Sequence, residues 1–300
     1  MKIHLIKTLL FATALLTRFA TAAQEKDLCF PFELTAQNNL SVPVRLNGTD
    51  SLRLMFHFAA DAVTLTTATT QKIRSVRFET TDSVSSWGGT GNTSRFSSNN
   101  TLQIGDRTWE QLPVWEDQYS GTGTDGKFGP HLFNKKALFI NFDKRQITVS
   151  DHVPVKGYQK FKLIHKHGML FIEAAMHVGR NTYLNQYLLH TGYSGDLLLD
   201  DAFVVKNHFN SLLKVTETNA LKDAFGNIVK VQKATVPQLT IGRFRFNHVP
   251  VGFFEGKLGT QQMSFMGADL LKRFNLIIDA ERQYIYLKPN KLHGTVFFKG

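Results

Sequence analysis

The chain has 300 residues, of which 42% are hydrophobic and 20% are charged, a balance typical of one large globular domain or of two domains of ordinary size. Its 25 phenylalanines favour a strand-rich fold, because aromatic side chains suit half-buried pleated surfaces. Cys29 is the only cysteine, which excludes an internal disulfide and a cysteine-based metal cluster, and we expect its thiol to be buried.

The first 23 residues have the pattern of a secretory signal peptide. Lys2 and Lys7 give a positive start, residues 9–16 form a short apolar run, and residues 20–22 (ATA) form a cleavage sequence of small residues. The run is too short to cross a bilayer, and no later run of about 18 apolar residues occurs, so we expect no transmembrane segment. The sequence therefore predicts an exported protein, periplasmic or secreted.

The chain is basic, with a formal net charge of +11, which becomes +8 once the three basic residues of the signal peptide are removed. Such a charge would suit an anionic partner such as an acidic polysaccharide, a membrane surface or a nucleic acid. Lys and Arg are scattered along the chain, however, which is typical of a solvated surface. Together with the export signal, this pattern argues against a nucleic-acid partner.

The first half of the remaining chain is predicted to be mostly strands. The stretch SVPVRLNG (41–48) alternates in polarity and ends in Asn-Gly, which indicates a hairpin. LQIGDRTW (102–109) places a glycine turn between two extended runs. ALFINFDKRQITVSD (137–151) has a polar turn between two apolar runs and predicts another hairpin.

The second half repeats this character after HVPVKGYQKF (152–161), whose Pro and Gly predict a joint. HKHG (165–168) has two histidines on one side of an extended segment, and we interpret it as a solvated turn rather than a metal site. LTIGRFRF (239–246) again has a glycine turn. GADLLKRFNLII (267–278) predicts a short helix, with Leu270, Leu271 and Phe274 on one face, followed by a strand.

Three blocks of sequence occur twice, in the same order. The offset between the copies grows slowly from 133 to 138 residues, as expected for two copies of one unit. We therefore predict two tandem lobes after a signal peptide at residues 1–23, namely residues 24–155 and 156–300. The aligned blocks are LMFHFAADAVTLT (54–66) with YLLHTGYSGDLLL (187–199), LQIGDRTWEQLPV (102–114) with LTIGRFRFNHVPV (239–251), and KFGPHLFNKKALFINFDKRQITV (127–149) with FMGADLLKRFNLIIDAERQYIYL (265–287).

This pattern resembles the aspartic peptidases of the pepsin and retropepsin type, and most closely the duplicated, exported aspartyl-peptidase-like proteins of bacteria. LLHTG (188–192) is similar to the Asp-Thr-Gly loop of the second lobe, and FMG (265–267) and KFG (127–129) stand where each lobe has an apolar-apolar-Gly strand. WGGTGN (87–92) stands where the family has a Gly-rich mobile hairpin. The resemblance implies a mostly β, bilobal acid-protease fold, built from two retropepsin-like units with one short helix each. It also implies a monomer, because each lobe supplies half of the cleft.

The same resemblance assigns the two catalytic aspartate positions to histidines. The first loop has His57-Phe58-Ala59 and the second has His190-Thr191-Gly192, where the family has Asp-Thr-Gly in both. Peptide hydrolysis in this family needs two carboxylates that hold one water and share one proton. Asp61 and Asp196 lie nearby but fall at non-equivalent positions of the two copies, so they do not replace the pair.

The two histidines allow three interpretations. They can be satisfied polar residues of a non-catalytic interface, or a neutral imidazole can serve as the base of an active peptidase. They can also form part of a metal site, for which a third ligand is required. The candidates for that ligand are His131, Asp196 and Asp269.

We predict a catalytically inactive protein that binds a peptide or another extended ligand in the cleft by strand-like pairing, with no cofactor. Phe58, Ala59, Thr191 and Gly192 are the expected ligand-binding residues. The alternatives are an active aspartic endopeptidase and a metal-assisted hydrolase that uses His57 and His190. Four Asn-x-Ser/Thr sequences would matter only in a glycosylating secretory system: Asn39, Asn47, Asn92 and Asn99.

Overall fold

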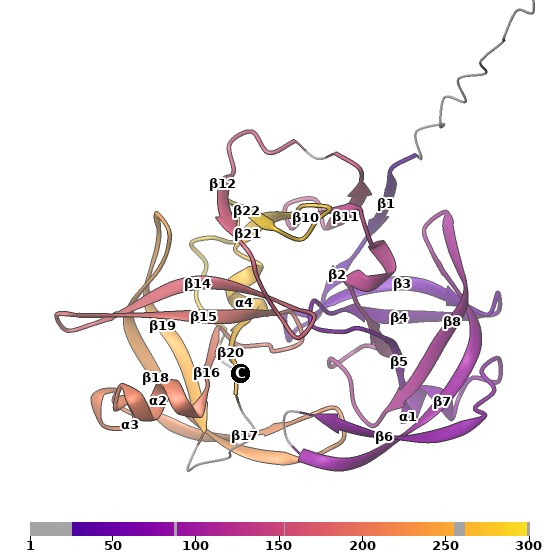
Figure 1. Ribbon diagram of the computed structural model, residues 1–300, viewed down its shortest axis with the longest axis horizontal. Helices are drawn as coiled ribbons and strands as arrows, with labels where there is room; N and C mark the ends of the chain where they lie inside the picture. The colour runs from indigo at the N-terminus through magenta and orange to yellow at the C-terminus, as the bar shows by residue number, and fades with distance from the viewer. Residues whose placement is uncertain (1–25, 87–88, 153, 255–261, 299–300) are drawn as a thin grey trace, which may run out of the picture.

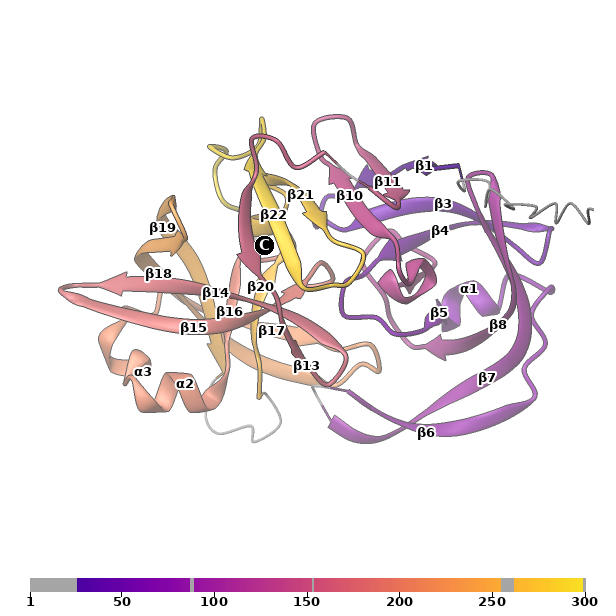
Figure 2. The ribbon, with the colours of Figure 1, turned by 45° about the horizontal axis from the view of Figure 1, so that its top comes forward.

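The computed structural model describes residues 26–86, 89–152, 154–254 and 262–298. The predicted signal peptide lies outside these residues. The described chain is mostly β and forms two lobes that lie side by side, with a third sheet joining them at one end (Figures 1 and 2). The part of the chain that the structure describes contains no helix long and apolar enough to span a bilayer.

The first lobe is a single eight-stranded sheet. An additional pairing between its second and seventh strands bends the sheet back on itself, so that the lobe resembles a barrel. In spatial order the strands are β2 (Glu33–Leu34), β3 (Leu40–Leu46), β4 (Asp50–Phe56), β9 (Gly126–Phe128), β5 (Val63–Thr66), β8 (Arg107–Asp117), β7 (Gly89–Ile104) and β6 (Thr80–Ser86).

The second lobe has the same strand order, strand for strand, and the same extra pairing, here between β14 and β18. In spatial order the strands are β13 (Ile164–Lys166), β14 (Met169–Val178), β15 (Asn181–His190), β20 (Ser264–Gly267), β16 (Leu197–Leu199), β19 (Phe244–Phe254), β18 (Ile228–Ile241) and β17 (Glu217–Lys222). The predicted architecture of two tandem β units is therefore confirmed.

The third sheet has six strands, three from each half of the chain. They are β1 (Leu28–Pro31), β11 (Gln146–Ser150), β10 (Ala137–Asn141), β21 (Phe274–Ile278), β22 (Tyr284–Pro289) and β12 (Gln159–Lys162). The order mirrors itself about the pairing of β10 with β21, where Phe139 lies opposite Ile277. Because this sheet mixes both halves, the division at residues 155 and 156 stays a prediction.

Helices are few and short. They are α1 (Thr67–Thr70), α2 (Asp201–Lys206), α3 (Phe209–Leu212) and α4 (Ala268–Leu271), with a 3-10 turn at Pro130–Phe133. The short helix followed by a strand that was predicted within residues 267–278 is confirmed, and the helix is the single turn α4. Phe274 does not belong to it, because it begins β21 and pairs with Pro289.

The turns follow local sequence, as predicted. Asn47 and Gly48 both have positive φ between β3 and β4, and Gly105 and Gly242 have positive φ in the two Ile-Gly turns. His167 and Gly168 form the turn between β13 and β14, so HKHG is a solvated turn. The strands β6 and β7 form the hairpin that was predicted at WGGTGN, of which residues 87 and 88 lie outside the described part of the chain.

The prediction that the thiol of Cys29 is buried is wrong. Leu28 and Phe30 point into the core, and the intervening Cys29 is therefore exposed on the other face of β1. The main apolar core runs through both lobes, and a second cluster in the second lobe includes Phe171, Leu198 and Phe265.

Candidate functional site

Two loops meet where the lobes touch. In the first lobe β4 runs parallel to β9 and ends one residue before His57, whose backbone N–H donates to the carbonyl of Phe128. In the second lobe β15 runs parallel to β20, and its last residue, His190, lies opposite Gly267. The same strand arrangement therefore delivers one histidine from each lobe to the interface.

The two imidazole rings are in direct contact. Their centroids are 4.6 Å apart and the ring planes are almost perpendicular, at 83°. His190 also stacks on Phe265, with centroids 4.3 Å apart. A Cβ at Gly192 would overlap the His57 ring, so only glycine lets the second loop approach this closely.

A hydrogen bond defines the tautomer of His190, whereas Nδ1 of His57 has no such bond. The backbone N–H of Tyr193 donates to Nδ1 of His190 over 2.9 Å, so the proton of the neutral His190 ring lies on Nε2. His57 is only 8% exposed, and its Nδ1 has no hydrogen-bond partner within the described structure. His57 therefore brings an unused polar atom to the interface.

Both imidazoles are neutral near pH 7. Burial, followed by the proximity of His190 and Lys127, holds the pKa of His57 well below its ordinary value. Burial lowers the pKa of His190 to about 4, and the Lys127 charge acts in the same direction. Protonating either ring would place a positive charge in a desolvated site beside another positive group.

Thr191 braces the two loops. Its hydroxyl accepts a hydrogen bond from the backbone N–H of Phe58 at 3.0 Å and donates one to the carbonyl of Phe56 at 2.9 Å. Phe58 occupies the equivalent position in the first loop and packs edge-on against Phe56 instead. Only the second lobe therefore supplies a bracing hydroxyl.

Two asparagines from the turn before β3 add cross-lobe hydrogen bonds that the sequence did not reveal. Asn39 donates to the carbonyl of Thr191, and Asn38 donates to the carbonyl of Ser194 and to a carboxylate oxygen of Asp269. The positive φ of Asn38 marks a turn, but no local pattern shows what the turn touches. Asn39 is 1% exposed, so the folded chain does not offer it for glycosylation.

A cavity of about 420 Å³ opens beside His57 in the first lobe. Its floor carries an ion pair between Asp117, whose side chain is 6% exposed, and Lys127, whose side chain is 19% exposed. Thr64 donates a 2.7 Å hydrogen bond to the same Asp117 oxygen. Lys127 is the residue that breaks the expected apolar-apolar-Gly pattern, a departure that did not by itself predict a cavity. The lining residues are His57, Ala59, Ala60, Asp61, Ala62, Thr64, Ser94, Trp115, Asp117, Lys127 and Phe225.

No known family model and no curated protein matches the sequence. Among solved structures, the crystal structure of an aspartic proteinase from Irpex lacteus matches with a TM-score of 0.58 and 13% sequence identity, covering 90% of this chain and 99% of that one. The chain has the fold of a pepsin-like aspartic proteinase. The closer resemblance to duplicated bacterial proteins stays a prediction.

In this aspartic-proteinase fold the proposed third metal ligands do not join the two histidines. Within the described ranges, no three His, Cys, Asp or Glu side chains gather in a way that could hold a metal ion. Asp196 lies beside Asp269, and burial together with that neighbour raises the pKa of Asp196 to about 9. Asp269 is engaged by Lys272 and Arg273, and His131 lies near Asp61.

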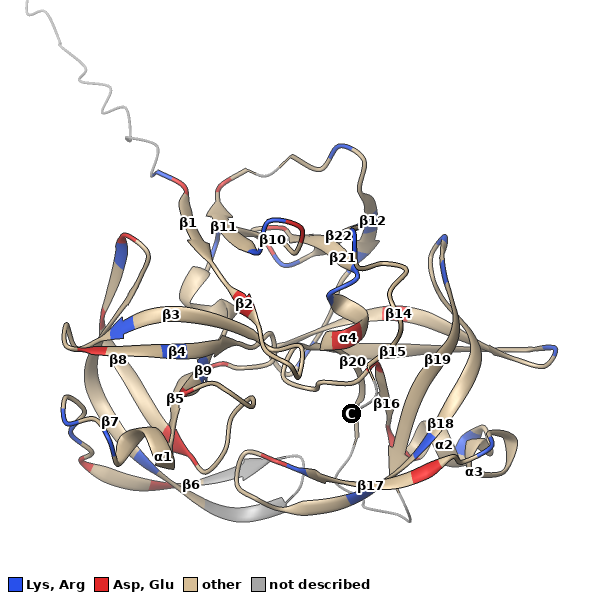
Figure 3. Cartoon of the chain, turned by 180° about the vertical axis from the view of Figure 1, so that it is seen from behind, with Lys and Arg blue, Asp and Glu red and all other residues tan. Residues whose placement is uncertain are grey.

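Charge does not single out one face of the fold. Figure 3 shows Lys and Arg spread over both lobes, among Asp and Glu. The charged groups near the two loops are instead paired with one another. Lys127 pairs with Asp117 in the first lobe, and Asp269 pairs with Lys272 and Arg273 in the second lobe.

Proposed function

We propose that the chain is a non-catalytic protein with the aspartic-proteinase fold, which binds a peptide or another extended ligand between its lobes. The observation that carries this proposal is the contact between His57 and His190, whose rings lie 4.6 Å apart. In the alignment of the two sequence repeats with the family pattern, these are the aspartate positions.

The chemistry of the pair argues against peptide hydrolysis. An aspartic peptidase needs one carboxylate as a base and its partner, protonated, as an acid, with a single proton shared between them. Nδ1 of His190 already accepts a hydrogen bond from Tyr193, which leaves Nε2–H as the ring's donor. Acid conditions would add positive charge to the pair, whereas an aspartate pair loses negative charge.

The fold still offers what an extended ligand needs. The hairpins β6–β7 and β17–β18, one from each lobe, run along the same side of the molecule, at the bottom of Figure 1. A chain lying between these hairpins and the two loops could pair with backbone groups as an added strand. Of the four expected ligand-binding residues, Ala59 lines the cavity beside His57 and Gly192 lies against the His57 ring. Phe58 and Thr191 are buried and support these loops from within.

Export and a monomeric state complete the proposal. The first 23 residues have the signal-peptide pattern, and one chain already supplies both loops of the interface, so a second copy is not required. No cofactor is invoked. The alternatives, an active aspartic endopeptidase and a metal-assisted hydrolase, would require His57 and His190 to act in catalysis.

The proposal is tested by peptide retention. Residues 24–300, purified without a histidine tag, are mixed with peptides from a denatured protein, separated by gel filtration and examined by mass spectrometry. We expect retained peptides of unchanged mass. An Ala62→Trp variant, which fills the cavity beside His57, should retain fewer peptides than the matched variant Ala68→Trp on the exposed side of α1.

Two outcomes would contradict the proposal. Retention of no peptide would remove the binding function, and recovery of shortened peptides would indicate an active peptidase. Metal analysis of the same sample tests the remaining alternative. Near-stoichiometric zinc that is lost in a His57→Ala, His190→Ala variant would favour a metal-assisted hydrolase instead.

A further inference from the structure

The cavity beside His57 has a polar floor, whereas the equivalent positions of the second lobe are apolar. Thr64 on β5 lies opposite Lys127 on β9, just as Leu198 on β16 lies opposite Phe265 on β20. Asp117 ends β8 at the position where Phe254 ends β19. Leu198, Phe254 and Phe265 all belong to the second lobe's apolar cluster.

Stability alone does not account for this polar floor. Asp117 is buried and Lys127 is partly buried, so the ion pair must offset a loss of hydration that apolar side chains would not suffer. Well-packed apolar side chains at such positions are often as stabilising or more so. The second lobe shows that the same strand arrangement accepts three apolar residues. The ion pair of Lys127 with Asp117 is therefore better explained by a ligand than by the needs of the fold.

Two polar groups at the cavity remain available to a ligand. Nδ1 of His57 is buried and has no partner among the described residues, and His57 is one of the residues that line the cavity. An ammonium group has three donors, and the Lys127 group uses one of them on Asp117. His57 and Lys127 line the same cavity, so the two side chains can act on one bound molecule.

The charges of the cavity select against a charged ligand group. Lys127 and Asp117 cancel each other, and the His57 ring is neutral. A carboxylate would also meet Asp61 at the lining, and an ammonium or guanidinium group would meet Lys127. A neutral group that both donates and accepts would suffer neither repulsion, since it can donate to Nδ1 of His57 and accept from Lys127.

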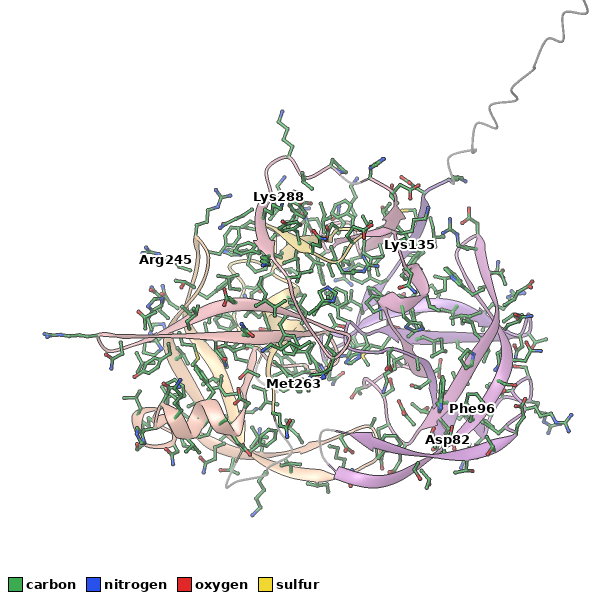
Figure 4. All side chains as sticks on the ribbon, viewed as in Figure 1. Asp82, Phe96, Lys135, Arg245, Met263 and Lys288 are labelled. Carbon is green, nitrogen blue, oxygen red and sulfur yellow. The ribbon has the colours of Figure 1, made fainter. Side chains whose placement is uncertain are left out.

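The second lobe covers this cavity with an apolar side chain. Phe225, at the tip of the β17–β18 hairpin, is one of the lining residues, although all the others come from the first lobe. The tip is fixed across the interface, because the backbone N–H of Tyr119 donates to the carbonyl of Ala224 over 2.8 Å. Phe225 and Trp115 thus provide apolar walls around the polar floor, and Trp115 is itself packed on Phe96, which Figure 4 labels.

We propose that this cavity is a side-chain pocket that takes one carboxamide, from glutamine or asparagine, of the extended ligand. The inference rests on the proposed function, because the ligand must first lie between the lobes. The amide N–H₂ donates to Nδ1 of His57, and the amide oxygen accepts from Lys127. The methylene groups of the side chain lie against Trp115 and Phe225.

The test uses ten-residue peptide pools in which one central position is fixed and the others are randomised. Pools with Gln, Asn, Glu, Lys, Leu or Phe at the fixed position are titrated against residues 24–300, with tryptophan fluorescence as the readout. We expect the Gln and Asn pools to bind about tenfold more tightly than the Leu, Glu and Lys pools, as one or two added hydrogen bonds would give.

A double variant, Lys127→Met with Asp117→Leu, removes the polar floor without leaving one buried charge unpaired. It should lose the amide preference and bind the Leu and Phe pools at least as well as the Gln pool. Lys162→Met, on the exposed side of β12, is the matched control and should keep the wild-type order. Should the double variant not fold, the order of the pools on the wild-type chain still decides the question.

The failures of the two proposals are distinguishable. Binding of all pools with equal affinity, a preference for Glu, Lys or Leu, or an amide preference that survives in the double variant would overturn the carboxamide pocket while leaving the binding function in place. Absence of binding by every pool would overturn the proposed function and, with it, the pocket.

Discussion

Thr191 contributes more to the meeting of the two loops than either histidine does. Its one hydroxyl serves two backbone groups of the first loop, the N–H of Phe58 and the carbonyl of Phe56, and all of these atoms are buried. Phe58 has no hydroxyl, so it cannot make the reciprocal hydrogen bond to the second loop. The interface therefore depends on Thr191 and on Asn39, whose side-chain amide donates to the Thr191 carbonyl. The loss of one bracing hydroxyl is thus offset by an amide from a distant turn.

Replacing Thr191 with valine should destabilise the chain strongly. Valine keeps the shape but leaves a buried donor and a buried acceptor unpaired, each of which costs about 1–3 kcal/mol. We expect the free energy of unfolding in urea to fall by about 2–4 kcal/mol. Thr108→Val, at an exposed position of β8, should change it by less than about 0.5 kcal/mol. Equal effects of the two variants would show that the bracing bonds contribute nothing.

The histidine pair should make the fold sensitive to acid. The pKa of His190 is about 4 in the folded chain and about 6.5 in the unfolded chain, so between these values only the unfolded state takes up the proton. Stability from this group is therefore full above about pH 6.5 and is lost as the pH falls toward 4, by up to about 3 kcal/mol. His57 shifts in the same direction.

Urea unfolding at pH 7, 5.5 and 4.5 measures this effect. Because several carboxylates also change their protonation in acid, the useful quantity is the difference between the wild type and His190→Asn, whose amide oxygen can accept from Tyr193. We expect the variant to lose less stability than the wild type between pH 7 and 4.5. Parallel pH profiles would show that His190 titrates normally.

At the scale of elements, local sequence was enough to predict the hairpins, but not what each element pairs with or packs against. The Asn-Gly and Ile-Gly turns were predictable because turn residues act through their own backbone conformations. In the predicted helix after Gly267 only Phe274 was misassigned, because its pairing with Pro289 prevails over helical spacing. Cys29 was misplaced because nothing local shows which side of β1 faces the core.

The candidate site was predictable in part, for the same reason. The repeat alignment found His57 and His190, since each stands at the end of a strand that occurs in both copies. It could not reveal Asn38, Asn39 or Phe225, because these residues act through contacts between segments far apart in sequence. Lys127 was visible as a departure from the repeated pattern, but its partner Asp117 was not.

The β17–β18 hairpin tip is held by one buried side chain. Asp223 accepts hydrogen bonds from the backbone N–H groups of Phe225 and Asn227. Asp223→Ala should loosen the tip, and with it the bond from Tyr119 to Ala224. Hydrogen exchange at the Tyr119 amide should then become at least about tenfold faster.

Asp82→Ala is the matched control for this variant. Asp82 is an exposed residue of the corresponding hairpin in the first lobe, and Figure 4 labels it. It should leave exchange at Tyr119 unchanged. If Asp223→Ala also leaves it unchanged, the tip of the hairpin does not depend on the Asp223 carboxylate for its contact with the first lobe.

The whole molecule keeps the two-lobed design of an aspartic proteinase while the two lobes have diverged at the interface. The strand order is identical in both lobes, and the six-stranded sheet takes three strands from each half of the chain in mirrored order. The second lobe supplies the bracing threonine, the stacking Phe265 and the covering Phe225, whereas the first supplies the polar cavity. An asymmetric interface suits the recognition of a ligand whose two ends differ better than a reaction that uses two equivalent carboxylates.

The central claim, that the paired imidazoles do not replace a carboxylate pair, is tested most directly by a cleavage assay. Residues 24–300 are incubated with a denatured protein at pH values from 3 to 8, with and without a pepstatin-type inhibitor, and products are identified by mass spectrometry. We predict no product above that of a His57→Ala, His190→Ala variant at any pH. Products that the inhibitor suppresses and the double variant does not form would contradict the account.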